Sequence, residues 1–153
     1  MSERTQDVHE RAETRFRTTG QRYTPARRRL VDILLEAGSP QAMHGILDRG
    51  RGLKQSSVYR NLAALERAGV VRRILADEGG FGRYELAEDL TGHHHHLVCS
   101  NCGAVEDVDF APAFEHTLEA ELAELADRTG FSAVSHRLDL IGLCRVCAAA
   151  ASA

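Results

Sequence analysis

Three stretches in the first half of the chain are predicted to be helical, and residues typical of helix ends bound the first and the third. Thr24-Pro25 predicts a helix start, because Thr caps exposed amides and Pro suits the first helical position, and Gly38 suits its end. Ser56 and Gly69 bound the third stretch in the same way. Helices are therefore predicted over 25–37, 42–49 and 57–68, with a weaker one over 8–18 before them.

Two short β-like runs follow, over 70–75 and 83–86, with a glycine-rich turn at 77–82 between them. This pattern predicts a hairpin. Successive helices followed by a hairpin are the order of a winged helix-turn-helix, whose third helix enters the DNA major groove. We therefore predict a winged-helix DNA-binding domain over 1–87 and a hinge at the polar segment 88–92.

The remaining residues, 93–153, have the pattern of a small α/β unit. Strands are expected over 96–99 and 104–108, and an amphipathic helix is expected from 114 until Gly130. Apolar positions then alternate with polar ones over 134–140, as in a half-buried strand. The alanine-rich end, 148–153, is expected to fray.

All four cysteines lie in this second half, in two Cys-x-x-Cys pairs, Cys99/Cys102 and Cys144/Cys147. Paired thiolates at this spacing are the ligands that a tetrahedral structural zinc prefers. A redox motif needs one pair only, and disulfides are typical of exported proteins, whereas the polar segment 1–17 has no signal-peptide core. We therefore predict a four-cysteine zinc site in a cytoplasmic protein.

Half of the eight histidines form the run His93-His94-His95-His96. Side chains alternate along an extended strand, so His93 and His95 should face one way and His94 and His96 the other. His136 stands at an apolar position of its predicted strand, where an ionisable side chain needs a partner. A site of His93, His95, Glu119 and His136 would suit zinc, iron, nickel, cobalt or manganese. The alternative is that His136 is a hydrogen-bonded core residue.

The net charge of −3 hides a polarised chain, since residues 15–73 carry 13 Lys and Arg against four acids, and 93–153 carry three Arg against nine acids. A basic half joined to an acidic half is typical of a DNA-binding module attached to a metal-binding module. No apolar run is long enough to span a bilayer, so no membrane partner is expected.

These residues together resemble the ferric uptake regulator superfamily of metal-dependent transcriptional repressors. The most specific matches are Val58-Tyr59-Arg60-Asn61-Leu62 and the run from His93 through Cys99 to Gly103. The matching segments, in the family's order, are residues 20–27, 57–62, 68–71, 83–86, 93–103, 135–136 and the pair Cys144/Cys147.

The resemblance implies an α+β protein with an N-terminal winged helix-turn-helix and a small α/β dimerisation domain closed by the four-cysteine zinc. It implies a homodimer that binds an AT-rich inverted repeat in double-stranded DNA when loaded with metal, without a small-molecule substrate and without catalytic residues. The carried-over positions are Cys99, Cys102, Cys144 and Cys147 for structural zinc; His93, His95, Glu119 and His136 for a second site, with Glu115 as the alternative carboxylate; Glu85, His94, His96 and Asp107 for an inter-domain site; and Arg22, Ser57, Tyr59 and Arg60 for DNA.

One departure concerns the loop after the second helix, where many relatives place a histidine of the inter-domain site. Here that stretch is Ala37-Gly38-Ser39-Pro40. The second metal is therefore open, with Zn²⁺ or Fe²⁺ preferred and Mn²⁺ or Ni²⁺ as alternatives. The competing functions are a zinc-dependent hydrolase, which needs an open zinc position and a general base, and a metal-storage protein.

Overall fold

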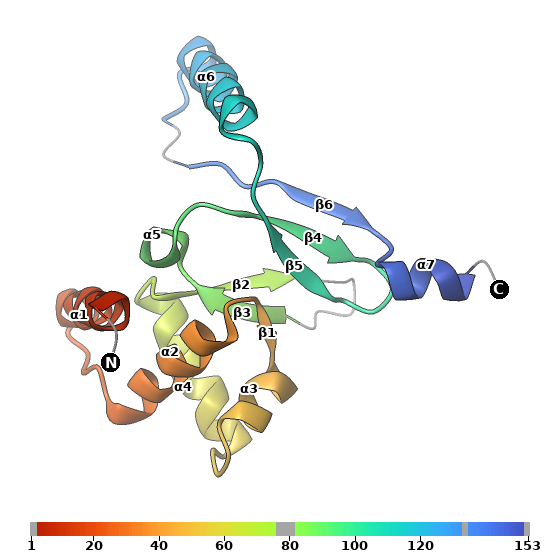
Figure 1. Cartoon of the computed structure of the whole chain (residues 1–153). Coiled ribbons are helices and arrows are strands. Elements are labelled where there is room, and N and C mark those ends of the chain that lie inside the picture. The colour runs from red at the N-terminus through yellow and green to blue at the C-terminus, as the bar shows by residue number, and fades with distance from the viewer. Residues whose placement is uncertain (1–2, 76–81, 133–134, 152–153) are drawn as a thin grey trace.

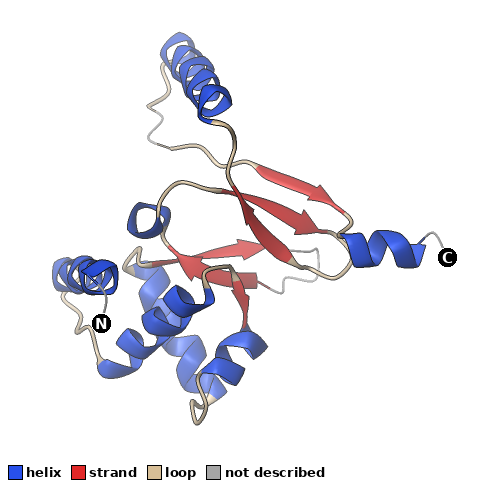
Figure 2. Ribbon diagram, viewed as in Figure 1, coloured by secondary structure: helices blue, strands red, loops and turns tan. Residues whose placement is uncertain are grey.

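The computed structural model describes residues 3–75, 82–132 and 135–151. Figure 1 shows a helical layer at the N-terminal end, a first sheet next to it, and a second sheet on the far side of the first. Figure 2 shows that the helices of the first half gather on one side of the two sheets. The predicted turn 77–82, except Gly82, lies outside the described residues, and so does Val134.

The helical layer consists of four helices that match the predicted spacing. They are α1 (Glu3–Thr18), α2 (Pro25–Ala37), α3 (Met43–Arg49) and α4 (Gln55–Arg67). The start of α2 is as predicted, because the Thr24 side chain accepts a hydrogen bond from the Arg27 amide. Gly38 ends α2 at a φ of 60°, in the left-handed region that favours glycine. The helix start expected at Ser56 is wrong: α4 begins at Gln55, because the carbonyl of Lys54 already accepts the first helical bonds.

The first sheet is the wing, and the two runs of the predicted hairpin form most of it. Its strands are β1 (Gln41–Ala42), β2 (Val71–Leu75) and β3 (Gly82–Leu86), in the order β1-β3-β2 and all antiparallel. The apolar stripes of the helices and the wing share one core, which includes Val8, Phe16, Leu30, Ile33, Leu62 and Leu65. The prediction of a winged helix-turn-helix is therefore confirmed.

The second half begins with α5 (Glu88–Thr91), a short helix where a hinge was expected. It continues with β4 (His95–Cys99), β5 (Val105–Val108), α6 (Pro112–Thr129), β6 (Asp139–Gly142) and α7 (Arg145–Ala151). The sheet order is β5-β4-β6, with β4 antiparallel to β5 and parallel to β6. The central position of β4 places the histidine run and Cys99 between two neighbouring strands.

Two expectations for this half are wrong. The strand predicted over 134–140 forms only over Asp139–Gly142, because a strand needs a partner and β4 pairs with these residues alone. The alanine-rich end does not fray over its described part, since Arg145–Ala151 form α7. Alanine is the best helix former, and a tether just before the helix removes part of the cost of nucleation.

The helix α6 stands apart from the rest of the chain, at the top of Figure 1. The structure describes all of α6, and no residue of it is buried. Large apolar side chains are exposed on α6 and on the C-terminal segments, namely Phe114, Leu125, Phe131, Leu140, Ile141, Leu143 and Val146. Exposed apolar side chains that gather on one part of a molecule often mark a site of interaction with another protein chain. Among the described helices, none has the length and apolar character needed to cross a membrane.

We expect Leu62→Ala to destabilise the winged-helix half strongly, because Leu62 is 1% exposed in its core. The loss should be about 2–5 kcal/mol in the free energy of unfolding, from lost burial and the cavity left behind. Leu97→Ala removes the same atoms at a position that is 37% exposed and should cost clearly less. Urea unfolding followed by circular dichroism measures both; equal losses would contradict this account of the core.

Candidate metal centres

Three groups of potential metal ligands surround β4, and in each group the candidate ligand atoms lie within 4.8 Å of one another. The groups are Cys99, Cys102, Cys144 and Cys147; His93, His95, Glu115 and His136; and Glu85, His94, His96 and Asp107. We call them the cysteine cluster, the second cluster and the inter-domain cluster. The alternation predicted for the four histidines is present, since odd and even positions fall into different clusters.

The cysteine cluster forms where two turns meet at the end of the second sheet. Cys99 ends β4, and a tight turn follows in which the Gly103 amide donates to the Cys99 carbonyl at 2.9 Å. The parallel pairing of β6 with β4 brings Cys144 alongside, so its amide donates to the Cys99 sulfur at 3.3 Å. The sulfurs of Cys102 and Cys144 are 3.8 Å apart. This distance excludes a disulfide between these two residues, since that bond is about 2.05 Å long, and all four cysteines are free thiols.

The thiols of this cluster differ in acidity. Hydrogen bonds from the backbone amides of Cys102 and Cys144 lower the pKa of Cys99 to about 6. The Asn101 amide lowers the pKa of Cys147, but the neighbouring sulfurs outweigh it and raise that pKa to about 11. Four sulfurs this close cannot all ionise at neutral pH without a compensating cation. A tetrahedral zinc supplies that charge, and the ligand types fit it.

The second cluster brings three imidazoles onto one carboxylate. His93 Nε2 lies 2.8 Å from Glu115 Oε1, His95 Nε2 lies 3.0 Å from Glu115 Oε2, and His136 Nε2 lies 2.9 Å from Glu115 Oε1. The Nε2 atoms of His93 and His95 are only 3.2 Å apart. Contact with the imidazoles, first of all His95, lowers the pKa of Glu115.

The hydrogen bonding of His136 indicates whether this cluster fits a metal. Its Nε2 is buried and lacks a hydrogen bond of acceptable geometry within the described part of the chain, although Glu115 is close. A buried polar atom without a hydrogen bond is costly, so a native structure normally supplies a partner. A cation held by Nε2 of the three histidines and the Glu115 carboxylate satisfies all four groups. The donor set fits a divalent metal of the zinc or iron type.

The carboxylate expected in this cluster was Glu119, with Glu115 as the alternative, and the structure places Glu115 there. The helix α6 starts at Pro112, and Glu115 lies in its first turn. This turn is the part of α6 nearest in sequence to β5, and from it the Glu115 carboxylate reaches His95 on β4. Glu119 is one helical turn farther on. It lines a cavity together with Glu115 but does not join the ligand group. Sequence spacing alone could not separate residues one turn apart on one helix face.

The inter-domain cluster joins the wing to the second sheet. Glu85 comes from β3, and its Oε2 lies 3.2 Å from Nε2 of both His94 and His96. Asp107 of β5 is farther away, with Oδ1 4.0 Å from His96 Nε2. Hence one carboxylate oxygen from the winged-helix half faces two imidazoles from the other half.

The outer nitrogens of these imidazoles have fixed roles. His94 Nδ1 lies 2.9 Å from the Gly92 carbonyl oxygen, and His96 Nδ1 lies 3.0 Å from Asp139 Oδ1. A carbonyl or carboxylate oxygen only accepts, so both Nδ1 atoms donate and both Nε2 atoms of the neutral rings present lone pairs inward. Such outer partners are typical of metal-binding histidines. Asp139 was not among the predicted site residues, because only the strand pairing reveals its proximity.

The charges in the inter-domain cluster depend on one another. Burial raises the pKa of Glu85, but hydrogen bonds with His96 and Arg72 outweigh it, so the net shift is downward. Burial lowers the pKa of His96, and bonds with Glu85 and Asp139 shift it upward overall. Burial raises the pKa of Asp107. The lone pairs facing the Glu85 carboxylate need a cation between them, and the site therefore fits a divalent metal as well as protons.

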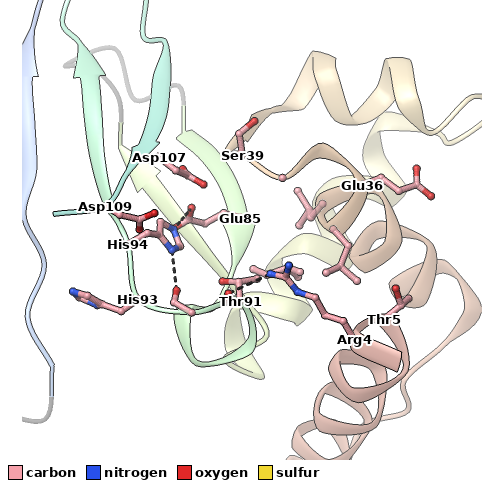
Figure 3. A pocket seen from close by; sticks show the side chains of 15 residues that line it. Arg4, Thr5, Glu36, Ser39, Glu85, Thr91, His93, His94, Asp107 and Asp109 are labelled. Carbon is pink, nitrogen blue, oxygen red and sulfur yellow. Dashed lines mark hydrogen bonds and ion pairs between the residues drawn. The ribbon is translucent and has the colours of Figure 1, made fainter. Parts of the chain in front are cut away.

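A cavity of about 520 Å³ opens beside this cluster, between the helical layer and the second sheet. Figure 3 shows Glu85, Asp107 and His94 on one side of it, with Ser39 and Arg4 on the other. Ser39 belongs to the loop in which the family resemblance led us to look for a histidine ligand, and it contributes no imidazole. The Arg4 guanidinium donates to the Thr91 carbonyl at 3.3 Å and thereby links α1 to α5.

The residues expected to contact DNA lie on the helical layer. Tyr59 is 48% exposed and Arg60 is exposed, both near the start of α4, while Ser57 is half-buried and its hydroxyl contacts Asn61. Arg22 is exposed in the segment between α1 and α2. The side chains of Tyr59 and Arg60 are therefore available on the helix that the winged-helix fold presents to DNA.

The comparisons with known proteins decide the family. The sequence pattern of the ferric uptake regulator family matches residues 18–141. The chain belongs to the ferric uptake regulator family. It is 36% identical over 119 residues to the zinc uptake regulation protein of Mycobacterium tuberculosis, covering 77% of this chain and 85% of the relative.

Two solved structures share the fold. The ferric uptake regulator of Vibrio cholerae is 27% identical, with a TM-score of 0.65 over 84% of this chain and 96% of that one. A zinc uptake regulator solved with zinc and DNA is 22% identical, with a TM-score of 0.55 over 97% and 98% of the two chains. Members of the family are metal-responsive transcription regulators and not enzymes. The hydrolase alternative is therefore wrong.

We expect the second cluster to distinguish the two carboxylates on α6. Glu115→Gln should weaken metal binding at this cluster about 10-fold or more, because it removes a charged ligand from among His93, His95 and His136. Glu119→Gln is the matched control on the same helix face and should change the affinity little. Isothermal titration with zinc after loading of the cysteine cluster measures both. A larger loss of zinc affinity in Glu119→Gln than in Glu115→Gln would make Glu119 the metal ligand, as the sequence predicted.

Cys144→Ser should lose the tightly held metal, because three thiolates no longer close a tetrahedral site. Since metal binding is coupled to folding, the association of two chains should be lost with it. Elemental analysis and light scattering measure the two quantities. Ser100→Ala, in the neighbouring turn, keeps all four thiols and should retain both. A zinc-free Cys144→Ser dimer that is well folded would reject a structural role for this metal.

Proposed function

We propose that this protein is a dimeric transcriptional repressor that binds an AT-rich inverted repeat when metal joins its wing to its dimerisation sheet. The genes it controls are those of metal homeostasis or a related stress response. The observation that carries the proposal is the origin of the inter-domain ligands. Glu85 belongs to the wing strand β3, whereas His94 and His96 belong to β4 or the residue before it. A metal held by all three restricts the orientation of the DNA-binding half relative to the other half.

The homodimer and double-stranded DNA are the partners of this regulator. The exposed apolar residues of α6 and of the C-terminal segments supply the dimer surface, because they gather on the half that carries the second sheet. A two-fold dimer presents two copies of α4, and two recognition helices related by two-fold symmetry match an inverted repeat. Metal that fixes the angle between the halves then fixes the spacing of these helices.

The metal proposed for the histidine clusters is zinc or ferrous iron. Both clusters offer imidazole and carboxylate ligands and include no thiolate, and such sites accept either ion. The name of the Mycobacterium tuberculosis relative, zinc uptake regulation protein, favours zinc, while relatives in Legionella pneumophila and Bacillus subtilis carry the name ferric uptake regulation protein. The cysteine cluster keeps its own zinc in either case.

Metal dependence is the direct test of this function. In a gel-shift experiment on an AT-rich inverted repeat, the protein with its cysteine cluster loaded should bind weakly in mild chelator. Zinc or ferrous iron should strengthen binding. His96→Ala removes a ligand of the inter-domain cluster and should abolish the response. Binding that is equally strong with and without chelator would contradict the proposal, as would a metal response that survives in His96→Ala.

The base-reading role proposed for Arg60 has a separate test. Arg60→Ala should cost about 1–3 kcal/mol on the specific site and relax discrimination there, because Arg can bond a guanine through two donors. Arg22→Ala, proposed to remove a minor-groove contact, should weaken binding most where the groove is narrow. Equal losses on specific and random DNA, with a salt dependence shallower by about one unit, would make Arg60 a phosphate contact.

A further inference from the structure

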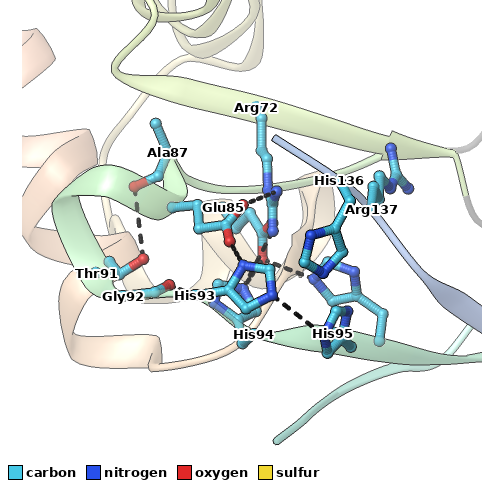
Figure 4. A network of polar contacts seen from close by, with 12 residues as sticks. Arg72, Glu85, Ala87, Thr91, Gly92, His93, His94, His95, His136 and Arg137 are labelled. Carbon is cyan, nitrogen blue, oxygen red and sulfur yellow. Dashed lines mark hydrogen bonds and ion pairs between the residues drawn. The ribbon is translucent and has the colours of Figure 1, made fainter. Parts of the chain in front are cut away.

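The guanidinium of Arg72, on β2, contacts two members of the inter-domain cluster, Glu85 and His94, and also Glu88. Nε donates to Glu85 Oε1, and Nη1 donates to Glu88 Oε2 at 3.2 Å. Nη2 lies 3.3 Å from His94 Nε2. Figure 4 shows the guanidinium pointing at Glu85, with the histidine run beside it. The Arg72 side chain is only 25% exposed, so these contacts define its position.

The contact with His94 places the guanidinium at a candidate ligand atom. His94 Nδ1 donates to the carbonyl oxygen of Gly92 at 2.9 Å, and Nε2 faces both Arg72 Nη2 at 3.3 Å and Glu85 Oε2 at 3.2 Å. A guanidinium has donors and no acceptor, so with the ring proton on Nδ1 alone, Arg72 donates to the Nε2 lone pair. That lone pair is also the one that His94 would offer to a metal in the inter-domain cluster. One lone pair cannot serve both cations.

We propose that Arg72 is an internal cation that competes with the metal for the inter-domain cluster and so sets the metal concentration at which the cluster fills. The inference rests on the proposed function, since it concerns the same site. A metal that takes His94 Nε2 displaces Nη2. It would leave the bond from Nε to Glu85 Oε1 in place, because Oε2 is the Glu85 oxygen that faces Nε2 of His94 and His96. The guanidinium charge then remains beside the metal and weakens its binding further.

Glu88 gives the displaced guanidinium an alternative partner. Its Oε2 already accepts from Arg72, and its Oε1 is paired with Nδ1 of His93, a ligand of the second cluster. The side chains of Arg72 and Glu88 are both about one-quarter exposed, at 25% and 23%, so neither is fully hydrated. When a metal takes His94 Nε2, Arg72 therefore keeps its bonds to Glu85 and Glu88 and remains beside the inter-domain cluster.

The test measures metal affinity of the inter-domain cluster by competition with a chromophoric chelator, using zinc alone. The protein carries His136→Ala to weaken the second cluster, and its cysteine cluster is loaded beforehand. Arg72→Met keeps an unbranched stem similar to the apolar part of the arginine side chain and removes the charge. It should tighten zinc binding about 10-fold or more, the size expected for losing one competing charged hydrogen bond. Arg72→Lys keeps the charge but cannot reach three partners at once, so its affinity should fall between the two.

Arg67→Met is the matched control, because it removes one positive charge from an exposed position on α4. It should leave the affinity within about twofold, since exposed charges are screened by solvent and salt. In the gel shift with His136 restored, Arg72→Met should lower the zinc concentration for half-maximal DNA binding by a similar factor. A structural role for Arg72 in orienting Glu85 predicts the opposite sign, because losing it would weaken zinc binding.

Unchanged or weaker zinc binding in Arg72→Met, with the fold intact by circular dichroism, would overturn this inference alone. If Arg72→Met does not fold, Arg72→Lys decides, since an affinity no tighter than that of Arg72 also overturns it. Failure of the proposed function looks different: the inter-domain cluster would then bind no zinc in any of the variants, and DNA binding would not respond to metal.

Discussion

The constraint on which the rest of this structure depends is the pleat of the extended segment from His93 to Cys99. Neighbouring side chains on an extended backbone point to opposite faces, so four consecutive histidines supply two different clusters. A shift of one residue in the pairing of β4 with β5 would exchange the two sets. The same strand ends at Cys99, so its register also places the first sulfur of the cysteine cluster. One strand therefore positions all three candidate metal centres.

Local patterns were sufficient for most of the fold. The caps at Thr24 and Gly38, the apolar stripe of α4 and the two runs of the wing are determined by residues close in sequence, and each was predicted from them. The errors occur where a distant partner decides. The length of β6 is set by its pairing with β4, and α7 follows the turn that brings Cys144 to Cys99. Periodicity within one segment contains no information about where its partner ends.

The candidate site residues likewise divide into those that local spacing identifies and those that depend on distant partners. Cysteine spacing and histidine alternation identify ligands directly, because residues two or three apart must share a face or a turn. The carboxylates could not be assigned with equal certainty. Glu115 and Glu119 are one helical turn apart, and only the start of α6 at Pro112 separates them. Asp139 and Glu88 were not recognised as parts of these sites, and the contact of Arg72 with Glu85 was not predicted, since each of these residues reaches its histidine or glutamate through tertiary packing.

The absence of a histidine from the loop 37–40 changes how a metal would act on the DNA-binding half. Ser39 lines the cavity beside the inter-domain cluster. The candidate ligand from the winged-helix half is instead Glu85, on strand β3 of the wing. Glu85 lies opposite Arg72 in the pairing of β3 with β2, and Tyr84, its neighbour on β3, belongs to the core shared with α4. Glu85 is therefore connected to α4 through the wing and its core. Because Arg72 binds Glu85 from the adjacent strand, the residue proposed to compete with the metal contacts the same wing carboxylate that would hold the metal.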